Sequence, residues 1–417
     1  MTRLRRAGRQ TFRSMQVHNF RLYFFGQMVS ASGSWMQQIA QVWLVLRLTG
    51  SGLALGITTA LQFTPVLLAG AWAGVIADRV DKRRLLIATS TTAAMLALSL
   101  GAITALGLVQ LWMVYTMAFL LGCVTALDSP ARRSFVTELV SDAHATNAVS
   151  LNSAAFTSAR VFGPALAGLV IATAGLAWCF FANAASFGAV IVGFLVMRID
   201  ELRPVEPEPR RKGQLREGLQ YVWATPALRL PLVMTAVIGT LSFNFQVTLS
   251  LLAKWTFHGS AGTFGLLYAL MSTGAVVGSL VVAHRERASR HFVALAALAF
   301  GMLMLLAAAA PTLLTEMVVL VAVGAAGIGF LSAAGALSQT VAEPAYRGRV
   351  AALFAVAFLG STPIGGPIVG AISQAFGPRA GLVLGGVTAT LTALVALYGL
   401  SRARRGTSLP ELAPRAA

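Results

Sequence analysis

Charged residues are scarce in this chain of 417 residues, and acidic residues are the scarcest of all. Asp and Glu number 14 beside 32 Lys and Arg, and together they make up 11% of the sequence. A soluble protein carries about 25% charged residues. Hydrophobic residues reach 57% and the mean hydropathy is +0.75, which excludes a soluble globule, a disordered chain and a fibrous repeat. Because a membrane-spanning helix needs about 20 apolar residues, we predict an all-α integral membrane protein.

Cysteine is also rare, and sequence motifs for catalysis are missing. Cys123 and Cys179 lie inside apolar runs, so we expect no disulfide and no metal site. The sequence contains neither a Gly-x-x-x-x-Gly-Lys-Ser phosphate loop nor a Gly-x-Ser-x-Gly nucleophile elbow. We therefore predict that the protein is not an enzyme, has no catalytic residues and holds no cofactor.

Long apolar runs divide the sequence into twelve candidate membrane spans. We place them near residues 20–47, 52–77, 85–106, 109–129, 148–173, 175–197, 229–256, 262–283, 292–310, 312–337, 350–374 and 379–401. An even number of spans with short loops puts both termini on the same side of the membrane. The first 18 residues are basic and hold no short apolar region of their own, so we expect no removable signal peptide.

The distribution of Lys and Arg predicts which side that is. Of the 32 basic residues, 28 fall in the terminal segments and in alternate loops, including a short loop at Arg132–Arg133. The other loops hold only Arg47, Lys254 and Arg379, and Arg160 alone lies inside a span. By the positive-inside rule the basic face and both termini are cytoplasmic, in a multi-pass protein of the bacterial cytoplasmic (inner) membrane. The net charge of +18 is then a topology signal, and we expect no nucleic-acid partner.

A polar segment separates the first six spans from the last six. Residues 198–227 begin with a proline-rich charged stretch, which indicates a solvated cytoplasmic linker. Residues 214–224 carry apolar side chains at helical spacing, which predicts an amphipathic helix on the membrane surface. We therefore divide the chain into an N-terminal six-helix half (1–197), the linker, and a C-terminal six-helix half with a basic tail (228–417).

The two halves share short glycine–proline motifs, the expected sign of a duplicated transporter fold. The fifth span contains Gly163 and Pro164, and the eleventh contains Gly366 and Pro367. Proline inside a span bends the helix, and glycine lets a neighbouring helix approach closely. We predict that these four residues form helix hinges in two pseudo-symmetric six-helix bundles; a plain small-residue packing face is the alternative.

The loop after the second span joins a glycine to a cluster of charges. It reads Gly74-Val75-Ile76-Ala77-Asp78-Arg79-Val80-Asp81-Lys82-Arg83-Arg84. An acid among bases at the membrane boundary can pair across a helix interface in one conformation and release in another. The alternative is that the loop is a simple stop signal of positive charges, which would need neither the acid nor the glycine.

This loop resembles the signature of the major facilitator superfamily, Gly-x-Leu-Ala-Asp-Arg-x-Gly-Arg-Arg, with Asp81 in place of the second glycine. Segments within residues 128–132, 147–153, 216–222 and 347–350 narrow the resemblance to the drug:proton antiporter branch, which includes the enterobactin exporter and macrolide efflux proteins. In that superfamily the loop latches the two halves in the outward-facing state. The resemblance therefore implies that Asp78, Arg79 and Arg83 are gating residues with a close helix contact at Gly74, and that a proton gradient supplies the energy.

Polar side chains gather on single faces of three spans. They include Gln38 and Gln41 on the first span, Asn152 and Thr157 on the fifth, and Asn244 and Gln246 on the seventh. Because polar side chains facing lipid are costly, we predict that these residues border a substrate pathway. Hydrogen bonding between helices is the alternative.

Arg160 lies deep in the fifth span. It is about twelve residues, or roughly 18 Å, from the start of the helix, close to the middle of the bilayer. An arginine there costs at least about 2.5–3.5 kcal/mol unless it is paired or hydrated. We predict that Arg160 belongs to the substrate pathway; the alternative is a fixed ion pair with Asp128 that only joins the fourth and fifth spans.

Together these features predict a secondary active transporter. It would export small amphiphilic molecules, such as a drug, a siderophore or another metabolite, in exchange for protons by alternating access. The alternatives are an uptake carrier or uniporter of the same fold, or a transport-dead sensor or scaffold. The expected partners are the lipid bilayer, the small-molecule substrate and protons, and we expect a monomer.

Overall fold

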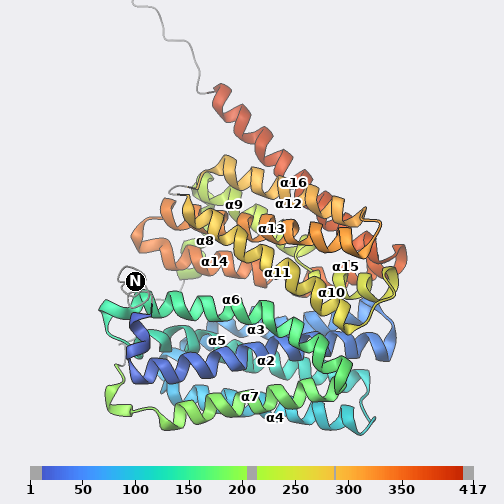
Figure 1. Ribbon diagram of the computed structural model, residues 1–417. Coiled ribbons are helices and arrows are strands. Elements are labelled where there is room, and N and C mark those ends of the chain that lie inside the picture. The colour runs from blue at the N-terminus through green and yellow to red at the C-terminus, as the bar shows by residue number, and fades with distance from the viewer. Residues whose placement is uncertain (1–11, 204–213, 286–287, 407–417) are drawn as a thin grey trace, which may run out of the picture.

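The computed structural model describes residues 12–203, 214–285 and 288–406, which are almost entirely helical (Figure 1). The helices are α2 (His18–Thr49), α3 (Gly52–Arg79), α4 (Lys82–Ala105), α5 (Leu111–Glu138), α6 (Asp142–Thr173), α7 (Leu176–Val196), α8 (Gln214–Ala224), α9 (Pro226–Ser242), α10 (Phe245–Leu251), α11 (Ala261–His284), α12 (Arg290–Ala308), α13 (Leu313–Val341), α14 (Arg347–Leu359), α15 (Thr362–Phe376) and α16 (Pro378–Gly406). Short 3-10 turns occur at η1 (Arg13–Gln16), η2 (Ile199–Glu201) and η4 (Pro344–Tyr346), and η3 (Leu252–Thr256) is a π-helical turn. These described residues contain no β-strand.

Among the described residues, eleven helical segments are long and apolar enough to cross a membrane. The first helix, α2, has 32 residues, but its glutamines and serines lower its hydropathy. It packs against α6 and α7 and so completes a group of six. Figure 1 shows α2 to α7 as one bundle, with α9 to α16 forming a second bundle stacked on it. The predicted all-α fold with two six-helix halves is confirmed.

Two spans of the C-terminal half are interrupted. The seventh is a single apolar segment, Pro226–Thr256, in which α9 and α10 are separated by Phe243 and Asn244. At this break the Asn244 side-chain amide donates to the Thr240 carbonyl at 2.7 Å, so the interruption is hydrogen-bonded within the protein. The eleventh span is divided into α14 and α15 around Gly360–Ser361.

The helices run back and forth between two sides of the molecule. We call the side that carries α8 and both described ends of the chain the linker side, and the opposite side the far side. Turns on the far side contain Gly50, Gly107, Gly175 and Gly377, whose φ angles are 61°, 70°, 97° and 94°. Because glycine adopts positive φ without a steric penalty, the chain reverses direction there in tight turns.

The two halves meet along two helix pairs, α3 with α15 and α6 with α11. A methyl group built on Gly52 of α3 would lie 2.7 Å from the Gly370 carbonyl oxygen of α15. In the other pair, a methyl group built on Gly168 of α6 would lie 2.8 Å from the Cα of Gly262 in α11. These backbones therefore touch without intervening side chains, as small residues allow between membrane helices.

Hydrogen bonds between the halves reinforce this contact on the far side. The Ser51 hydroxyl donates to Oε1 of Gln374 at 2.7 Å, and Oε1 also accepts from the Leu53 amide at 3.2 Å. Nζ of Lys254 donates to the carbonyl of Leu46, the last turn of α2, at 2.7 Å. Within the part of the chain that the structure describes, every hydrogen bond between α2–α7 and α9–α16 lies on this side. The far side is thus closed.

The predicted linker helix forms, but it packs on protein. α8 lies against α14 and the turn η4 before it, where Tyr221 stacks on Tyr346 with ring centroids 4.2 Å apart and 9° between the planes. Glu217 pairs with Arg349 at 2.9 Å, and Val222 is fully buried. One face of α8 therefore covers the linker-side end of the C-terminal half, whereas Leu219 and Trp223 are 45% and 55% exposed, and the position of this helix on the membrane surface stays a prediction.

Candidate functional site: a polar cavity in the N-terminal half

A cavity of about 840 Å³ lies among the helices of the N-terminal half. Its polar wall consists of Gln27, Ser34, Gln37, Gln38 and Gln41 from α2, Gln62 from α3, Thr89 and Ser90 from α4, Thr125, Asp128, Ser129, Arg132 and Arg133 from α5, Asn152, Ser153 and Thr157 from α6, and Asn183 from α7. The volume is in the range of small-molecule binding sites. Because Arg133 and Val149 lie near the linker-side ends of α5 and α6, the cavity extends toward the linker side.

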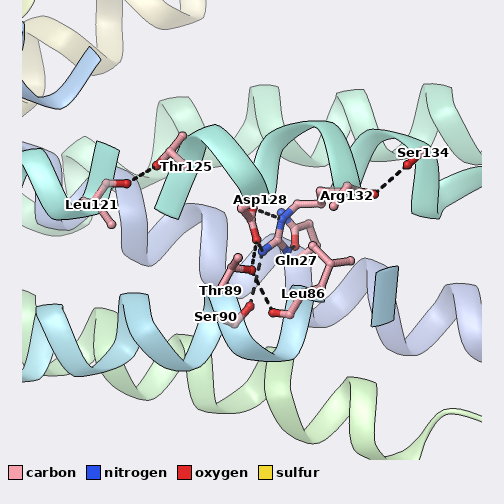
Figure 2. A network of polar contacts seen from close by, with 10 residues as sticks. Gln27, Leu86, Thr89, Ser90, Leu121, Thr125, Asp128, Arg132 and Ser134 are labelled. Carbon is pink, nitrogen blue, oxygen red and sulfur yellow. Dashed lines mark hydrogen bonds and ion pairs between the residues drawn. The ribbon is translucent and has the colours of Figure 1, made fainter. Parts of the chain in front are cut away.

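A buried ion pair forms part of the cavity wall (Figure 2). Arg132 donates from Nε to Oδ2 of Asp128 at 2.6 Å and from Nη2 to Oδ1 at 2.7 Å, one turn apart on α5. Oδ1 also accepts from the Thr89 hydroxyl at 2.8 Å, and Nη1 of Arg132 donates to Oε1 of Gln27. This bidentate geometry joins α2, α4 and α5 and compensates both charges at the cavity wall, where Asp128 is half-buried.

The structure corrects the position of Arg132. We expected a cytoplasmic loop at Arg132–Arg133, but α5 continues without interruption to Glu138. Arg132 is 8% exposed, and Glu138 pairs with Lys82 in a second buried contact. We predicted a loop because two adjacent arginines are typical of one. The signal for a helical ion pair was the spacing of four residues between Asp128 and Arg132, which places the two side chains on the same helix face.

Four of the predicted pathway residues meet at the cavity. Gln38 and Gln41 of α2 face Asn152 and Thr157 of α6 across it. Oδ1 of Asn152 is buried and has no hydrogen-bond partner among the described residues, so it is free to accept from a ligand. Sequence reasoning missed Asn183 of α7, which lines the cavity and donates to Oε1 of Gln37 at 2.7 Å.

The two pathway residues predicted on the seventh span lie elsewhere. Asn244 and Gln246 do not line the cavity, whose wall comes entirely from residues 27–187. Asn244 is instead 6% exposed at the break between α9 and α10. The interruption of this span was not visible in its continuous apolar pattern.

Arg160 also lies outside the cavity wall. Its guanidinium carbon is 5.5 Å from the ring centroid of Trp35, which does line the cavity. The ion pair with Asp128 that we considered as an alternative is not formed, since Asp128 pairs with Arg132. Arg160 borders a small space of about 10 Å³ that is otherwise formed by C-terminal residues such as Phe243 and Met271.

The residues predicted to form the gate are located within the N-terminal half. Gly74 is buried in α3, and Arg79 is exposed at the end of this helix. Arg83 donates from Nε to the Phe194 carbonyl in the last turn of α7 at 2.7 Å. The side chain of Asp78 lies outside what the structure describes. The departure at Asp81 has a local role, because its carboxylate accepts from the Arg84 amide at 2.8 Å and begins α4.

The four predicted hinge residues lie at helix contacts. α6 is continuous through Gly163 and Pro164, and α15 through Gly366 and Pro367. Gly366 packs against the backbone of Gly56 in α3, so this motif contributes to the interface between the halves. The break in the eleventh span lies earlier, around Gly360.

Known transport proteins are similar to this chain in sequence and in fold. The chain is 26% identical to the staphyloferrin A transporter of Staphylococcus aureus. The match covers 62% of this chain and 66% of that protein, so this chain spans just under two thirds of that relative. It is 27% identical to the multidrug efflux pump Tap of Mycolicibacterium fortuitum, over 90% of this chain and 94% of the pump. A solved bacterial homologue of the lysosomal transporter Spinster shares the fold, with a TM-score of 0.71, 14% identity, and coverage of 92% and 96%.

A family match covers almost the whole sequence. Residues 9–411 match the family described as transmembrane secretion effectors. The match confirms the resemblance to drug and siderophore transporters of the major facilitator superfamily, and the helices described above supply the two-bundle architecture of a secondary transporter. Among the described residues no group of three His, Cys, Asp or Glu side chains is arranged to hold a metal ion. The chain belongs to the transmembrane secretion effector family of the major facilitator superfamily.

Proposed function

We propose that this transporter is a proton-coupled exporter that takes its substrate from the cytoplasm into the cavity of the N-terminal half. The observation that carries the proposal is the position of that cavity: it extends toward the linker side while hydrogen bonds and glycine contacts close the far side. An arrangement open on one side and closed on the other is one state of an alternating-access cycle. The transporter acts as a monomer in this proposal.

The orientation in the membrane rests on charge. The linker side carries the basic residues assigned by the positive-inside rule, so it faces the cytoplasm of a bacterial inner membrane. With that orientation the cavity loads from the cytoplasm, as export requires. The names of Tap and of the staphyloferrin A transporter support a drug or a siderophore as the cargo.

Asp128 is our candidate for the residue that carries the coupling proton. It lines the cavity, where a substrate and water reach it, and its partner Arg132 would be released when the carboxylate is protonated. The other candidate carboxyl, Glu316, is 1% exposed in the first turn of α13 on the far side and does not line the cavity. Intramembrane ionisable groups are functional candidates because burying them is costly.

Everted vesicles test the direction and the coupling together. Cells expressing the protein yield vesicles whose cytoplasmic face points outward, and uptake of ethidium or of a fluorescent siderophore analogue is followed with and without a pH gradient. Uptake that needs the gradient in wild-type protein and is lost in Asp128→Asn, at equal amounts of folded protein, supports the proposal. Movement in the opposite direction, or uptake unaffected by an uncoupler, identifies an uptake carrier or uniporter, and no movement of any cargo identifies a sensor.

A further inference from the structure

The side chains around the cavity also identify a class of substrate. We infer that the transported molecule carries an anionic oxygen, and that Arg160 provides a binding position for it that Trp35 covers in this conformation. The inference rests on the proposed transport function, and the charged group would be a carboxylate, a sulfonate or a comparable acid.

Arg160 has unused hydrogen-bonding capacity. Its buried Nε has no hydrogen-bond partner, and no carboxylate among the described residues lies within 4.0 Å of its guanidinium. An arginine offers five N–H donors in a planar fork that matches an oxyanion. The contact with the Trp35 ring supplies only about 0.5–2 kcal/mol, which does not replace hydrogen bonds that water would make. The guanidinium therefore has donors available for an anion near the middle of the bundle.

Trp35 connects this receptor to the cavity. The Trp35 side chain contributes to the cavity wall, and the same ring lies 5.5 Å from the guanidinium carbon of Arg160. Its ring also packs on Tyr268 of α11 in the other half, with centroids 5.7 Å apart. A movement of α11 relative to α2 would therefore release the indole and open a path from the cavity to Arg160.

The space that Arg160 shares with the C-terminal half is too small for a substrate in the present state. It amounts to about 10 Å³ and is bordered by Phe243, Phe245 and Phe300 of the C-terminal half, which is about the room a single water needs. An anion can enter this space only after the two halves rearrange. Arg160 would then hold the charged group while the aromatic rings contact the apolar part of an amphiphile.

The charge balance of the cavity also favours an anionic substrate. Its ionisable wall residues are Asp128, Arg132 and Arg133, and the ion pair neutralises the first two. Arg133 is exposed and leaves the wall with an excess of one positive charge. A positively charged cleft with low-dielectric walls raises the local concentration of anions. Glutamine amides on α2 and α3 supply further neutral donors along the way.

Two dyes of matched shape test the inference. Anilinonaphthalene sulfonate carries an anionic group, and phenylnaphthylamine has the same aromatic rings without it. Binding of each dye to purified full-length protein in nanodiscs is measured by fluorescence, with empty nanodiscs subtracted. We expect Arg160→Gln to weaken binding of the sulfonate at least tenfold while binding of the neutral dye changes less than twofold, and Arg160→Lys to lie between. Arg47→Gln, an exposed arginine at the end of α2, is the control.

The role of Trp35 has a separate readout. Trp35→Ala should increase the preference for the sulfonate over the neutral dye, and this gain should disappear in the Trp35→Ala, Arg160→Gln double variant. Equal loss of both dyes in Arg160→Gln, or a Trp35→Ala effect that persists without Arg160, overturns the inference. If wild-type everted vesicles move ethidium or phenylnaphthylamine and leave the sulfonate untouched, export stands and the anionic class fails. If none of these cargoes moves, the proposed function fails independently of the binding result.

Discussion

Gly163 of α6 lies directly against Trp35 of α2. A methyl group built on Gly163 would be 2.5 Å from Cβ of Trp35 and 2.8 Å from the Ser32 carbonyl oxygen. The glycine therefore sets how closely the two helices approach and where the indole lies between the cavity and Arg160. The sequence suggested Gly163 only as a hinge residue, and this contact gives it a role in helix packing.

Gly163→Ala should accordingly impair the protein. Forcing a methyl group into this contact costs about 1–3 kcal/mol, and it displaces the Trp35 indole. We expect a lower melting temperature in detergent and slower transport. Gly188→Ala in α7 is the matched control, because a methyl group there meets nothing within 4 Å and removing a helix glycine gains about 0.5–1 kcal/mol. Equal melting temperatures for the two variants would contradict the packing role.

The Asp128–Arg132 pair should behave as one unit. Removing either partner leaves an uncompensated, partly buried charge, which costs up to about 3–5 kcal/mol. We expect Asp128→Ala and Arg132→Met each to reduce the yield of folded protein, and the double variant to recover most of it. Thermal unfolding of the purified variants gives the coupling energy. A double variant as unstable as the sum of the single ones would show that the two charges act independently.

The far-side hydrogen bonds should control the conformational equilibrium. Lys254→Met removes a charge-assisted bond to the Leu46 carbonyl, worth about 1.5–3 kcal/mol, and so favours opening of the far side. A cysteine placed at Ser153 in the cavity wall, with Cys123 and Cys179 replaced by alanine, reports accessibility to an impermeant maleimide. We expect labelling from the linker side to fall and labelling from the far side to rise. Unchanged labelling would show that these hydrogen bonds do not control the conformational equilibrium.

The docking of α8 should depend on Tyr221 more than on Glu217. Tyr221 stacks on Tyr346 and its hydroxyl accepts from the Glu343 amide at 3.1 Å, whereas the Glu217 side chain is 55% exposed in its pair with Arg349. An exposed pair contributes about 0–1 kcal/mol, and an aromatic pair adds about 0.5–1.5 kcal/mol beyond its buried area. Tyr221→Ala should therefore lower the melting temperature clearly and Glu217→Gln very little. The reverse order would mean that charge holds the helix.

Hydropathy was sufficient to predict most of the architecture. Helix number, the division into halves and the linker helix follow from apolar runs and charge positions, which are local properties. The position of Arg132 was not predicted, because a charge inside a helix and a charge in a loop look alike until the partner Asp128 is considered. Packing of α8 on α14 was equally invisible, since an amphipathic face suits protein and membrane alike.

The cavity was only half predicted for a similar reason. Gln38, Gln41, Asn152 and Thr157 share faces that helical spacing reveals, and they do border it. Which spans turn those faces toward one another is a tertiary property, so the sequence could not show that Asn244 and Gln246 lie away from this cavity. That Trp35 separates Arg160 from the cavity likewise follows from contacts between helices and from no local pattern.

Part of the attraction between the halves acts only at very short distance. It comes from the glycine contacts between α3 and α15 and between α6 and α11. Backbone atoms at Gly52 and Gly370, or at Gly168 and Gly262, attract one another mainly by dispersion, and a gap of 0.5–1 Å forfeits roughly a quarter to a half of that attraction. The closed state is therefore stiff against small displacements and weak against larger ones. A displacement of this size therefore loses up to about half of the dispersion between the glycines, and the far-side hydrogen bonds supply the resistance that remains until they break.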